Sequence, residues 1–241
     1  ELEGFAYIAS HDLKEPVRNI GSFTNLALRS LEAKQIAEVE EYLNFVKESA
    51  EQMYVLIGDV LEFSRVNEEK GVPREVDLAD IIDKIELTIR PMLDSRQAVI
   101  NRQKLPAIKA DPTQLFILLK NLIENGLKYN ESPKARVSIH FEEGKGAYHK
   151  LIVSDNGIGI AAEYQDQVFG MFKRLHNRSE YKGSGLGLSI CKKIIKSMEG
   201  EITLVSTPQK GSTFILSIPK AIVITSADTV LKSSLRTILD A

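Results

Sequence analysis

One histidine near the start of the chain, His11, stands where its imidazole could act on a substrate. It lies in the stretch Ser10 to Pro16, whose flanking apolar or small residues recur at strides of three and four, the pattern of a helix packed along another helix. His11 lies about 160° around the helix axis from the seam residues Ala9 and Leu13, because a helix turns about 100° per residue. We therefore expect His11 to face solvent, with the Asp12 carboxylate beside it able to hold one tautomer or take a proton.

A row of polar side chains between residues 115 and 130 forms a second candidate site. Asn121, Asn125 and Lys128 fall at i, i+4 and i+7, on one face of a predicted helix. Two amides and an amine suit a hydrated Mg²⁺ and a phosphate, because Mg²⁺ takes oxygen ligands and keeps much of its water. In isolation, the row is better explained as the exposed polar face of an amphipathic helix.

A carboxylate with two nearby glycines follows a predicted strand at Asp155-Asn156-Gly157-Ile158-Gly159. Such a carboxylate can accept a hydrogen bond from an adenine amino group, and the glycines allow the backbone to approach the base. Asp-Asn-Gly is also an ordinary turn sequence, so the motif alone leaves both readings open.

A glycine-rich loop, Gly183-Ser184-Gly185-Leu186-Gly187-Leu188, opens a predicted helix. Free N–H groups at such a helix start attract phosphate. A dinucleotide-binding fold is disfavoured because the sixth position is Leu188 and no clear strand precedes the loop. The Gly-Lys-Ser/Thr of the phosphate-binding loop is also absent.

The composition bounds the class of protein. The 241 residues include 31 Lys and Arg and 33 Asp and Glu, and the resulting net charge of −2 gives no reason to propose nucleic-acid binding. The single Cys191 excludes an internal disulfide and fits a reducing compartment. No apolar run approaches the ~20 residues that cross a bilayer, and no signal peptide opens the chain. The sequence begins within a helical pattern with no cap, so we expect a fragment of a longer protein. We place this fragment in the cytoplasm, and leave open whether the full-length protein is soluble or anchored to a membrane.

The elements that must position these residues fall into two parts. The first is a pair of long helices, one ending near Leu31 and the other running from Val39 to Ser64. Such a pair makes an antiparallel hairpin whose apolar stripe is too wide for one hairpin to cover. We therefore predict a homodimer through residues 1–67, in which two hairpins close a four-helix bundle.

The second part follows a boundary at residues 67–73, beyond which helical and strand periods alternate. The predicted elements are a helix from Asp77 to about Leu93, a strand at 98–102, a helix from Asp111, strands at 136–141 and 148–154, a helix at 186–198, and a hairpin of 202–206 with 213–218. Helices on one face of a mixed sheet make an α/β sandwich.

Taken in order, these motifs resemble those of the sensor histidine kinases of two-component signalling, over residues 5–219. Ser10 to Pro16 is similar to the H box, Asn121 to Asn130 to the N box, and Asp155 to Gly159 to the G1 box. The remaining similar segments are the F box at 169–172, the G2 box at 183–188 and the last glycine motif at 211–214. The resemblance implies a helical hairpin forming a dimeric four-helix bundle, followed by an α/β sandwich ATP-binding domain of the histidine kinase, gyrase and Hsp90 type.

The resemblance also implies an activity. His11 would be the phosphoacceptor and Asp12 its acid/base neighbour, with ATP and Mg²⁺ as cofactors. Asn125 would ligate the Mg²⁺, with Asn121 nearby. The phosphoryl group would then pass from the histidine to an aspartate in the receiver domain of a response regulator, while any upstream sensor domain lies outside this fragment.

The same resemblance assigns residues to the nucleotide. Lys128 and Arg174 would contact phosphates, Tyr129 would line the site, Asp155 would read adenine, and Thr213 would support the base through water. The remaining ATP-binding residues that it implies are Gly157, Gly159, Phe172, Gly183, Gly185, Leu186, Gly187 and Leu188.

Glu15 departs from the family pattern. Related kinases often carry Thr or Asn at this position, and that residue is associated with phosphatase activity on the regulator. Lys14-Glu15-Pro16 is similar to the phytochrome-like kinases, so the kinase interpretation holds while phosphatase activity does not follow from it.

The predicted domains are a hairpin at 1–69, an ATP-binding domain at 70–220 and a tail at 221–241. The tail resembles the first strand and helix of a receiver domain, at 221–224 and 231–239, but the expected acidic pair would fall at Ser226 and Ala227. It is either the truncated start of a degenerate receiver, which we favour, or a helix that packs on the catalytic domain.

Two other functions fit parts of the sequence. Topoisomerase, mismatch-repair and chaperone ATPases share the ATP fold, but they carry a water-activating Glu where this chain has Asn121. An amide cannot serve as that base. A non-catalytic dimerisation module with a decayed pocket is the other alternative, and the presence of every expected pocket residue argues against it.

Overall fold

The computed structural model describes residues 2–68, 72–175, 181 and 183–224, and of residues 2–10, 67–68 and 223–224 it describes the backbone alone. The chain divides into two compact units. One holds the residues up to 65 together with 170–186, and the other holds 66–169 with the residues from 187 onward.

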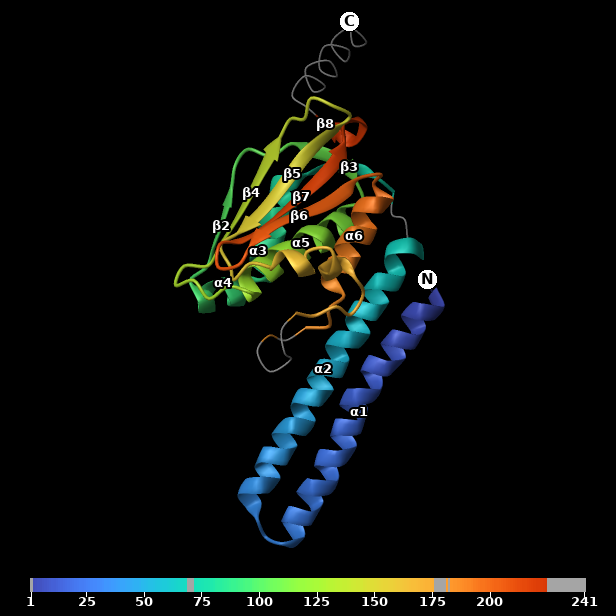
Figure 1. Ribbon diagram of the computed structural model, residues 1–241, viewed down its shortest axis with the longest axis vertical. Helices are drawn as coiled ribbons and strands as arrows, with labels where there is room; N and C mark the ends of the chain where they lie inside the picture. The colour runs from blue at the N-terminus through green and yellow to red at the C-terminus, as the bar shows by residue number, and fades with distance from the viewer. Residues whose placement is uncertain (1, 69–71, 176–180, 182, 225–241) are drawn as a thin grey trace, which may run out of the picture. The chain divides into compact units, whose positions relative to one another are not determined.

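Two long antiparallel helices make up most of the first unit, as predicted: α1 (Leu2–Glu32) and α2 (Ile36–Glu68) (Figure 1). The chain reverses at residues 33–35, where the Gln35 N–H donates to the Ser30 carbonyl at 2.8 Å. The Ser30 hydroxyl donates to Glu38 Oε2 at 2.8 Å, so the end of α1 is fastened to the start of α2. Between the helices, the Phe23 ring stacks on Phe45 with centroids 4.7 Å apart.

A five-stranded mixed sheet organises the second unit, in the order β2-β4-β5-β7-β6. The strands are β2 (Val99–Arg102), β4 (Arg136–Glu142), β5 (Tyr148–Asp155), β6 (Glu201–Thr207) and β7 (Gly211–Pro219). Strand β2 pairs parallel with β4, and every other pairing in this sheet is antiparallel. These strands match the predicted ones to within two residues at either end.

A layer of helices covers one face of this sheet (Figure 1). Its members are α3 (Leu78–Thr88), α4 (Arg90–Arg96), α5 (Pro112–Lys128) and α6 (Gly187–Ser197), with the short turns η1 (Ala162–Tyr164) and η2 (Gln167–Phe169) beside α6. Fully buried side chains such as Leu119, Leu151 and Ile194 fill the space between helices and sheet. The predicted α/β sandwich is therefore confirmed.

The single helix predicted from Asp77 to about Leu93 is wrong, because the segment forms two helices. Ile89 adopts the non-helical angles φ −98° and ψ 13°, and Pro91 stands in the first turn of α4. A proline costs little there, since that N–H has no partner within the helix, whereas inside a continuous helix it would remove a bond and clash.

A second sheet, absent from the prediction, has three short strands in the order β1-β3-β8. They are β1 (Arg74–Asp77), β3 (Ala107–Ala110) and β8 (Val223–Ile224), the last preceded by the turn η3 (Lys220–Ile222). The predicted receiver strand at 221–224 thus pairs in part with Ala107 and Ile108 of β3. The predicted helix at 231–239 and the positions Ser226 and Ala227 lie outside the described residues.

Candidate active site

Helix α5 fixes the row of polar side chains that the sequence singled out. The Asp111 carboxylate caps its start by accepting the Thr113 N–H at 2.8 Å, and Pro112 occupies the first turn. Four apolar residues, Leu118, Leu119, Leu122 and Ile123, are at most 1% exposed and face the core. Asn121, Asn125 and Lys128 consequently lie together on the opposite, half-buried face.

The end of α5 is fixed by an arginine that sequence reasoning missed. Arg96 Nη1 donates to the carbonyls of Leu127 at 2.7 Å and Lys128 at 3.3 Å, which the end of a helix leaves without internal partners, and to the Asn130 carbonyl just beyond the helix at 3.3 Å. Lys128 Nζ donates to Tyr129 Oη at 3.1 Å and lies 4.6 Å from the centre of that ring. No local sequence signal links Arg96 to a helix end more than thirty residues away.

Asp155 ends strand β5 beside α5. Its Oδ1 accepts the N–H of Gly157 at 2.8 Å and that of Ser212 at 3.1 Å. Burial raises the pKa of this carboxyl to about 6, against the smaller lowering effect of the two N–H groups. Within the described residues no hydrogen bond reaches Oδ2, so this oxygen remains as an acceptor for a donor on a bound molecule.

The glycines near Asp155 serve close approach between segments of the protein itself. A Cβ on Gly157 would come within 2.2 Å of the Tyr129 carbonyl oxygen, and one on Gly126 within 2.9 Å of Asp155 Cβ. Gly159 has a φ of +69°, and a Cβ there would come within 2.0 Å of the Thr207 carbonyl oxygen. The end of α5 and the Asp155 loop are thereby held together, a role that differs from the predicted approach to a base.

Asn156 braces the same loop and was not among the predicted site residues. Its Oδ1 accepts from Asn130 Nδ2 at 2.9 Å and from the Arg136 N–H at 2.7 Å. Its Nδ2 donates to Ser132 Oγ at 3.2 Å and to the Lys134 carbonyl at 3.0 Å. Each polar atom of the Asn156 side chain has two partners, so this side chain fixes the position of the loop. From the sequence alone, Asn156 was interpreted only as part of a turn.

Three further predicted residues belong to the same unit as Asp155 and α5. Thr213 pairs with Ser154 across β5 and β7, and their hydroxyl oxygens are 3.1 Å apart. Gly187 begins α6 so near α5 that a Cβ on it would come within 2.7 Å of Asn121 Oδ1. Leu188 follows in the first turn of α6. The second unit therefore brings together the α5 row, the Asp155 loop, Thr213 and the end of the glycine loop.

The rest of the predicted ATP-binding residues lie in the first unit: Phe172, Arg174, Gly183, Gly185 and Leu186. There the Arg174 guanidinium donates at 2.6 Å to the carbonyls of Gly183 and Tyr181, so in this structure it braces the segment around the glycine loop. Gly185, with φ +81°, packs where a Cβ would lie 2.9 Å from the Phe172 carbonyl carbon. The Ser184 hydroxyl donates to Asp59 of α2.

His11 is placed on α1 as the helical pattern predicted, with 74% of its side chain exposed. Its Nδ1 lies 3.1 Å from Asp12 Oδ1. When Nδ1 carries the proton and donates it to Asp12, Nε2 keeps a lone pair directed away from this partner and can act as a nucleophile. Glu15, one turn further along α1, is half-buried.

A metal ion at this site would depend on amide and phosphate oxygens. Among the described residues, no three His, Cys, Asp or Glu side chains gather closely enough to hold a metal ion. The half-buried Asn125 offers one amide oxygen, which fits Mg²⁺ because this ion is commonly held by few protein ligands plus water and nucleotide phosphates.

Among the described residues, no helix has the length and apolar character needed to cross a bilayer.

Comparison with known families gives two matches along the chain. Residues 1–69 match the model of the His Kinase A (phospho-acceptor) domain, and residues 110–222 match that of the histidine kinase-, DNA gyrase B- and HSP90-like ATPases. These families correspond to the helical hairpin and to most of the α/β unit. The second of these families consists of ATPases, which share an ATP-binding fold.

Several curated proteins are similar in sequence. The phytochrome-like protein Cph1 of Synechocystis is 36% identical over 219 residues, which cover 91% of this chain and 29% of that protein. The autoinducer 2 sensor kinase/phosphatase LuxQ of Vibrio vulnificus is 31% identical over 87% of this chain and 25% of its own length. The chain thus spans between a quarter and a third of the length of these relatives.

Solved structures share the fold. The Acinetobacter baumannii histidine kinase AdeS superimposes with a TM-score of 0.63 at 22% identity, covering 87% of this chain and 97% of that one. Full-length ShkA in complex with AMPPNP gives a TM-score of 0.61 at 20% identity, over 93% of this chain and 46% of that one. Both likenesses concern the arrangement of helices and strands.

Proposed function

This chain belongs to the sensor histidine kinases of two-component signalling, and we propose that it transfers the γ-phosphoryl group of ATP to His11. The observation that carries the proposal is the exposed imidazole whose Nδ1 lies 3.1 Å from Asp12 Oδ1. In the proposed step, Nε2 attacks the γ-phosphorus, the new N–P bond forms, and the bond to the bridging oxygen breaks to release ADP. Asp12 takes the Nδ1 proton as positive charge develops on the ring.

The nucleotide end of the proposal rests on α5 and the Asp155 loop. Asp155 Oδ2 would accept a hydrogen bond from the adenine amino group, and Thr213 would support the base through water. Asn125 would ligate Mg²⁺ with Asn121 nearby, while the Lys128 ammonium and the free N–H groups at the start of α6 would bind the phosphates. The Mg²⁺ ion would shield the charge of the phosphates, and the protein would supply positioning.

We extend the proposal to the whole signalling reaction. Histidine kinases generally dimerise and pass the phosphoryl group to a response regulator, and we propose both for the protein to which this chain belongs. The hairpin at 1–69 would dimerise and carry the phosphoryl group, and residues 70–220 would bind ATP. Because intracellular ATP is the donor, we place the reaction in the cytoplasm.

Labelling with γ-³²P-ATP and Mg²⁺ tests the proposal. We expect the wild-type chain to gain label that is lost in acid and kept in alkali, as for a phosphoramidate, and the His11→Gln variant to gain none. His140→Gln is the matched control, because His140 is a partly exposed histidine on β4. Equal labelling of the His11→Gln variant would place the acceptor elsewhere and refute the mechanism.

The related ATPases remain the alternative activity, and one residue separates them from this chain. They need a carboxylate to activate water, whereas the Asn121 amide donates to the Ile117 carbonyl at 3.0 Å and cannot act as a base. Release of inorganic phosphate without labelled protein would support that alternative.

A further inference from the structure

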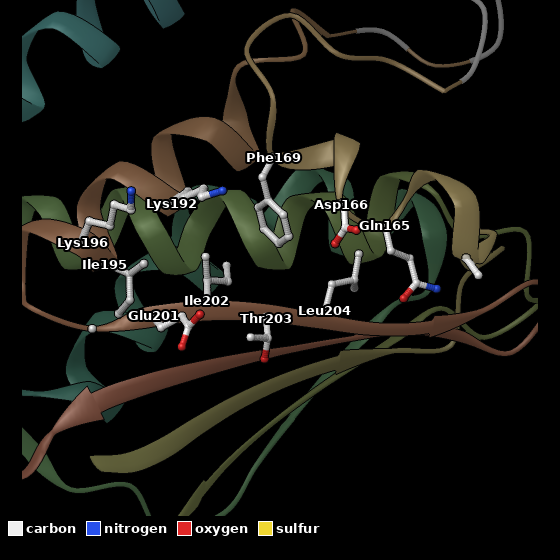
Figure 2. A pocket seen from close by; sticks show the side chains of 12 residues that line it. Gln165, Asp166, Phe169, Lys192, Ile195, Lys196, Glu201, Ile202, Thr203 and Leu204 are labelled. Carbon is white, nitrogen blue, oxygen red and sulfur yellow. The ribbon is translucent and has the colours of Figure 1, made fainter. Parts of the chain in front are cut away.

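A groove of about 670 Å³ lies between α6 and the edge of the five-stranded sheet, and none of its lining residues belongs to the proposed nucleotide site. One wall is formed by four consecutive residues of β6, from Glu201 to Leu204, and the other by α6 and by η1 and η2 (Figure 2). A strand edge that forms one side of an elongated groove is suited to an extended chain rather than to a compact ligand.

The β6 backbone presents hydrogen-bonding groups to this groove. In the described part of the chain, β7 is the one strand that pairs with β6. The Thr207 carbonyl points into the β6–β7 hairpin, where it accepts the Lys210 N–H at 3.0 Å, while the Ser206 carbonyl accepts Gln165 Nε2 at 2.8 Å instead. Successive residues of an antiparallel strand direct their backbone groups to opposite sides, so Ile202 and Leu204 direct theirs, like Ser206, toward the open edge.

The groove has an apolar centre. Ile195 of α6 points toward β6, and Ile202 and Leu204 point toward α6, with Phe169 beside them (Figure 2). Phe169 and Leu204 are partly exposed, whereas Ile195 is fully buried. Partly exposed apolar side chains beside a free strand edge offer one apolar side chain of an added strand a place to be buried.

The charges on the helix side of the groove are separated along its length. Lys192 and Lys196 lie one turn apart on α6, with Lys196 at the end nearest Gly200, and both are exposed. Asp166 lies at the other end, beside Gln165 (Figure 2). The carboxylate of Glu201 falls on the other face of the sheet, because it alternates with Ile202.

We propose that this groove binds an extended peptide segment of a partner protein, which adds to β6 as an antiparallel strand. From its N-terminus, every second residue of the peptide would face the helices, and these three residues would be basic, apolar and acidic in turn, spanning about 13 Å. The acidic residue would lie opposite Ile202 and meet Lys192 and Lys196. The apolar one would lie opposite Leu204, and the basic one would approach Asp166. This inference does not depend on the proposed kinase activity.

The probe is a fluorescent heptapeptide, acetyl-Thr-Lys-Thr-Val-Thr-Glu-Thr-amide, titrated into the full 241-residue chain. We expect saturable binding, with slowed hydrogen exchange at the amides of Ile202 and Leu204. The double variant Lys192→Glu with Lys196→Glu should weaken binding at least tenfold. The matched control, Lys84→Glu with Lys109→Glu, makes the same charge change at exposed lysines outside the groove and should leave binding unchanged.

Modified peptides separate strand addition from simple charge attraction. Methylating the backbone nitrogens of the peptide's valine and glutamate, which would face β6, should abolish binding, whereas methylating its central threonines should not. A peptide with lysine and glutamate exchanged should bind less well. Equal binding of both methylated forms, equal competition by N-acetylglutamate amide alone, or no binding by the heptapeptide would each overturn the proposal.

Discussion

His11 and Asp155 hold their side chains in opposite environments, and each environment suits the role proposed for that residue. The imidazole lies in water, with 74% of its side chain exposed, so its Nε2 is accessible to an incoming phosphate. The Asp155 carboxyl is buried, and burial raises its pKa to about 6, so it binds a proton once the pH falls below about 6. Recognition of adenine by Asp155 should therefore depend on pH in the mildly acidic range.

We predict that nucleotide affinity falls as the pH drops below about 6. Above the pKa of Asp155 the carboxylate is ionised and accepts the adenine amino group, whereas below it the bound proton must be released on binding. Each pH unit below the pKa should then weaken binding up to tenfold. Dissociation constants measured for ADP from pH 7.5 to 5 would show the trend.

The control for this experiment is Asp155→Asn, because protons on the nucleotide phosphates titrate in the same range. The variant should bind weakly throughout and should lack the part of the pH slope that Asp155 supplies. Identical slopes in variant and wild type would remove Asp155 from contact with the base.

Glu15 lies one helical turn from His11, where an ionised side chain would face the phosphoryl group of a regulator during dephosphorylation. Like charges that close repel by about 1 kcal/mol in water and by several times more where water is excluded. We predict weak phosphatase activity, with Glu15→Thr raising it and leaving autophosphorylation of His11 largely unchanged. The measurement is loss of phosphate from a phosphorylated regulator in the presence of ADP. Fast loss with the wild type, slowed by Glu15→Thr, would show that Glu15 positions the attacking water.

At the scale of single elements, α5 carries most of the proposed nucleotide site, and its end is fixed by Arg96. Removing that guanidinium takes this donor from the last two carbonyls of α5 and from the Asn130 carbonyl just beyond it. We predict that Arg96→Ala lowers the free energy of unfolding by about 1–2 kcal/mol and weakens nucleotide binding.

Arg90→Ala is the matched control, because Arg90 lies on the same short helix, α4, as Arg96. The exposed ion pair of Arg90 with Asp94 should contribute less than about 0.5 kcal/mol. Urea unfolding measures the free energy of unfolding of both variants. Equal decreases in the Arg96→Ala and Arg90→Ala variants would mean that Arg96 does not cap α5.

The elements differ in how far the sequence predicts them. Helices α1, α2 and α5 repeat an apolar stripe over many turns, so their periods stand out and their faces could be assigned. Strands β1 and β3 were not predicted, because each has four residues with a single β-branched side chain, whereas β2, equally short, begins with Val99 and Ile100 and was predicted. The stability of β1 and β3 comes from pairing with distant segments, which no local pattern records.

The residues of the candidate site also differ in how far the sequence predicts them. The positions of side chains on one regular element, such as Asn121 and Asn125, can be predicted from helical spacing alone. Asn156 and Arg96 act through bonds to segments distant in the sequence, and Asn156 reads locally as a turn residue. The placement of Arg174 also could not be foreseen, because its bonds to Gly183 and Tyr181 depend on how one loop folds back on itself.

At the scale of the whole molecule, the two units bury their apolar residues to different extents. The α/β unit encloses a core of fully buried aliphatic side chains between helices and sheet. The hairpin instead leaves large apolar side chains more than half exposed, among them Val17, Leu28, Leu31, Leu43 and Leu61. A surface of this kind on a stable hairpin is typical of a buried interface.

We predict that the chain is a dimer at 10 µM, assembled through its hairpins. Burying one leucine side chain contributes about 1.5–3 kcal/mol, so a patch of this size on each protomer can supply the free energy of a stable pair. Replacing Leu28 and Leu43 together by glutamate should give monomers, because four charges would enter the interface of each dimer. Leu87→Glu is the control, since Leu87 is 77% exposed but lies on α3 of the other unit. Sedimentation equilibrium measures the mass directly. A wild-type chain that sediments as a monomer at this concentration would leave the exposed stripe without its partner and would refute the four-helix bundle.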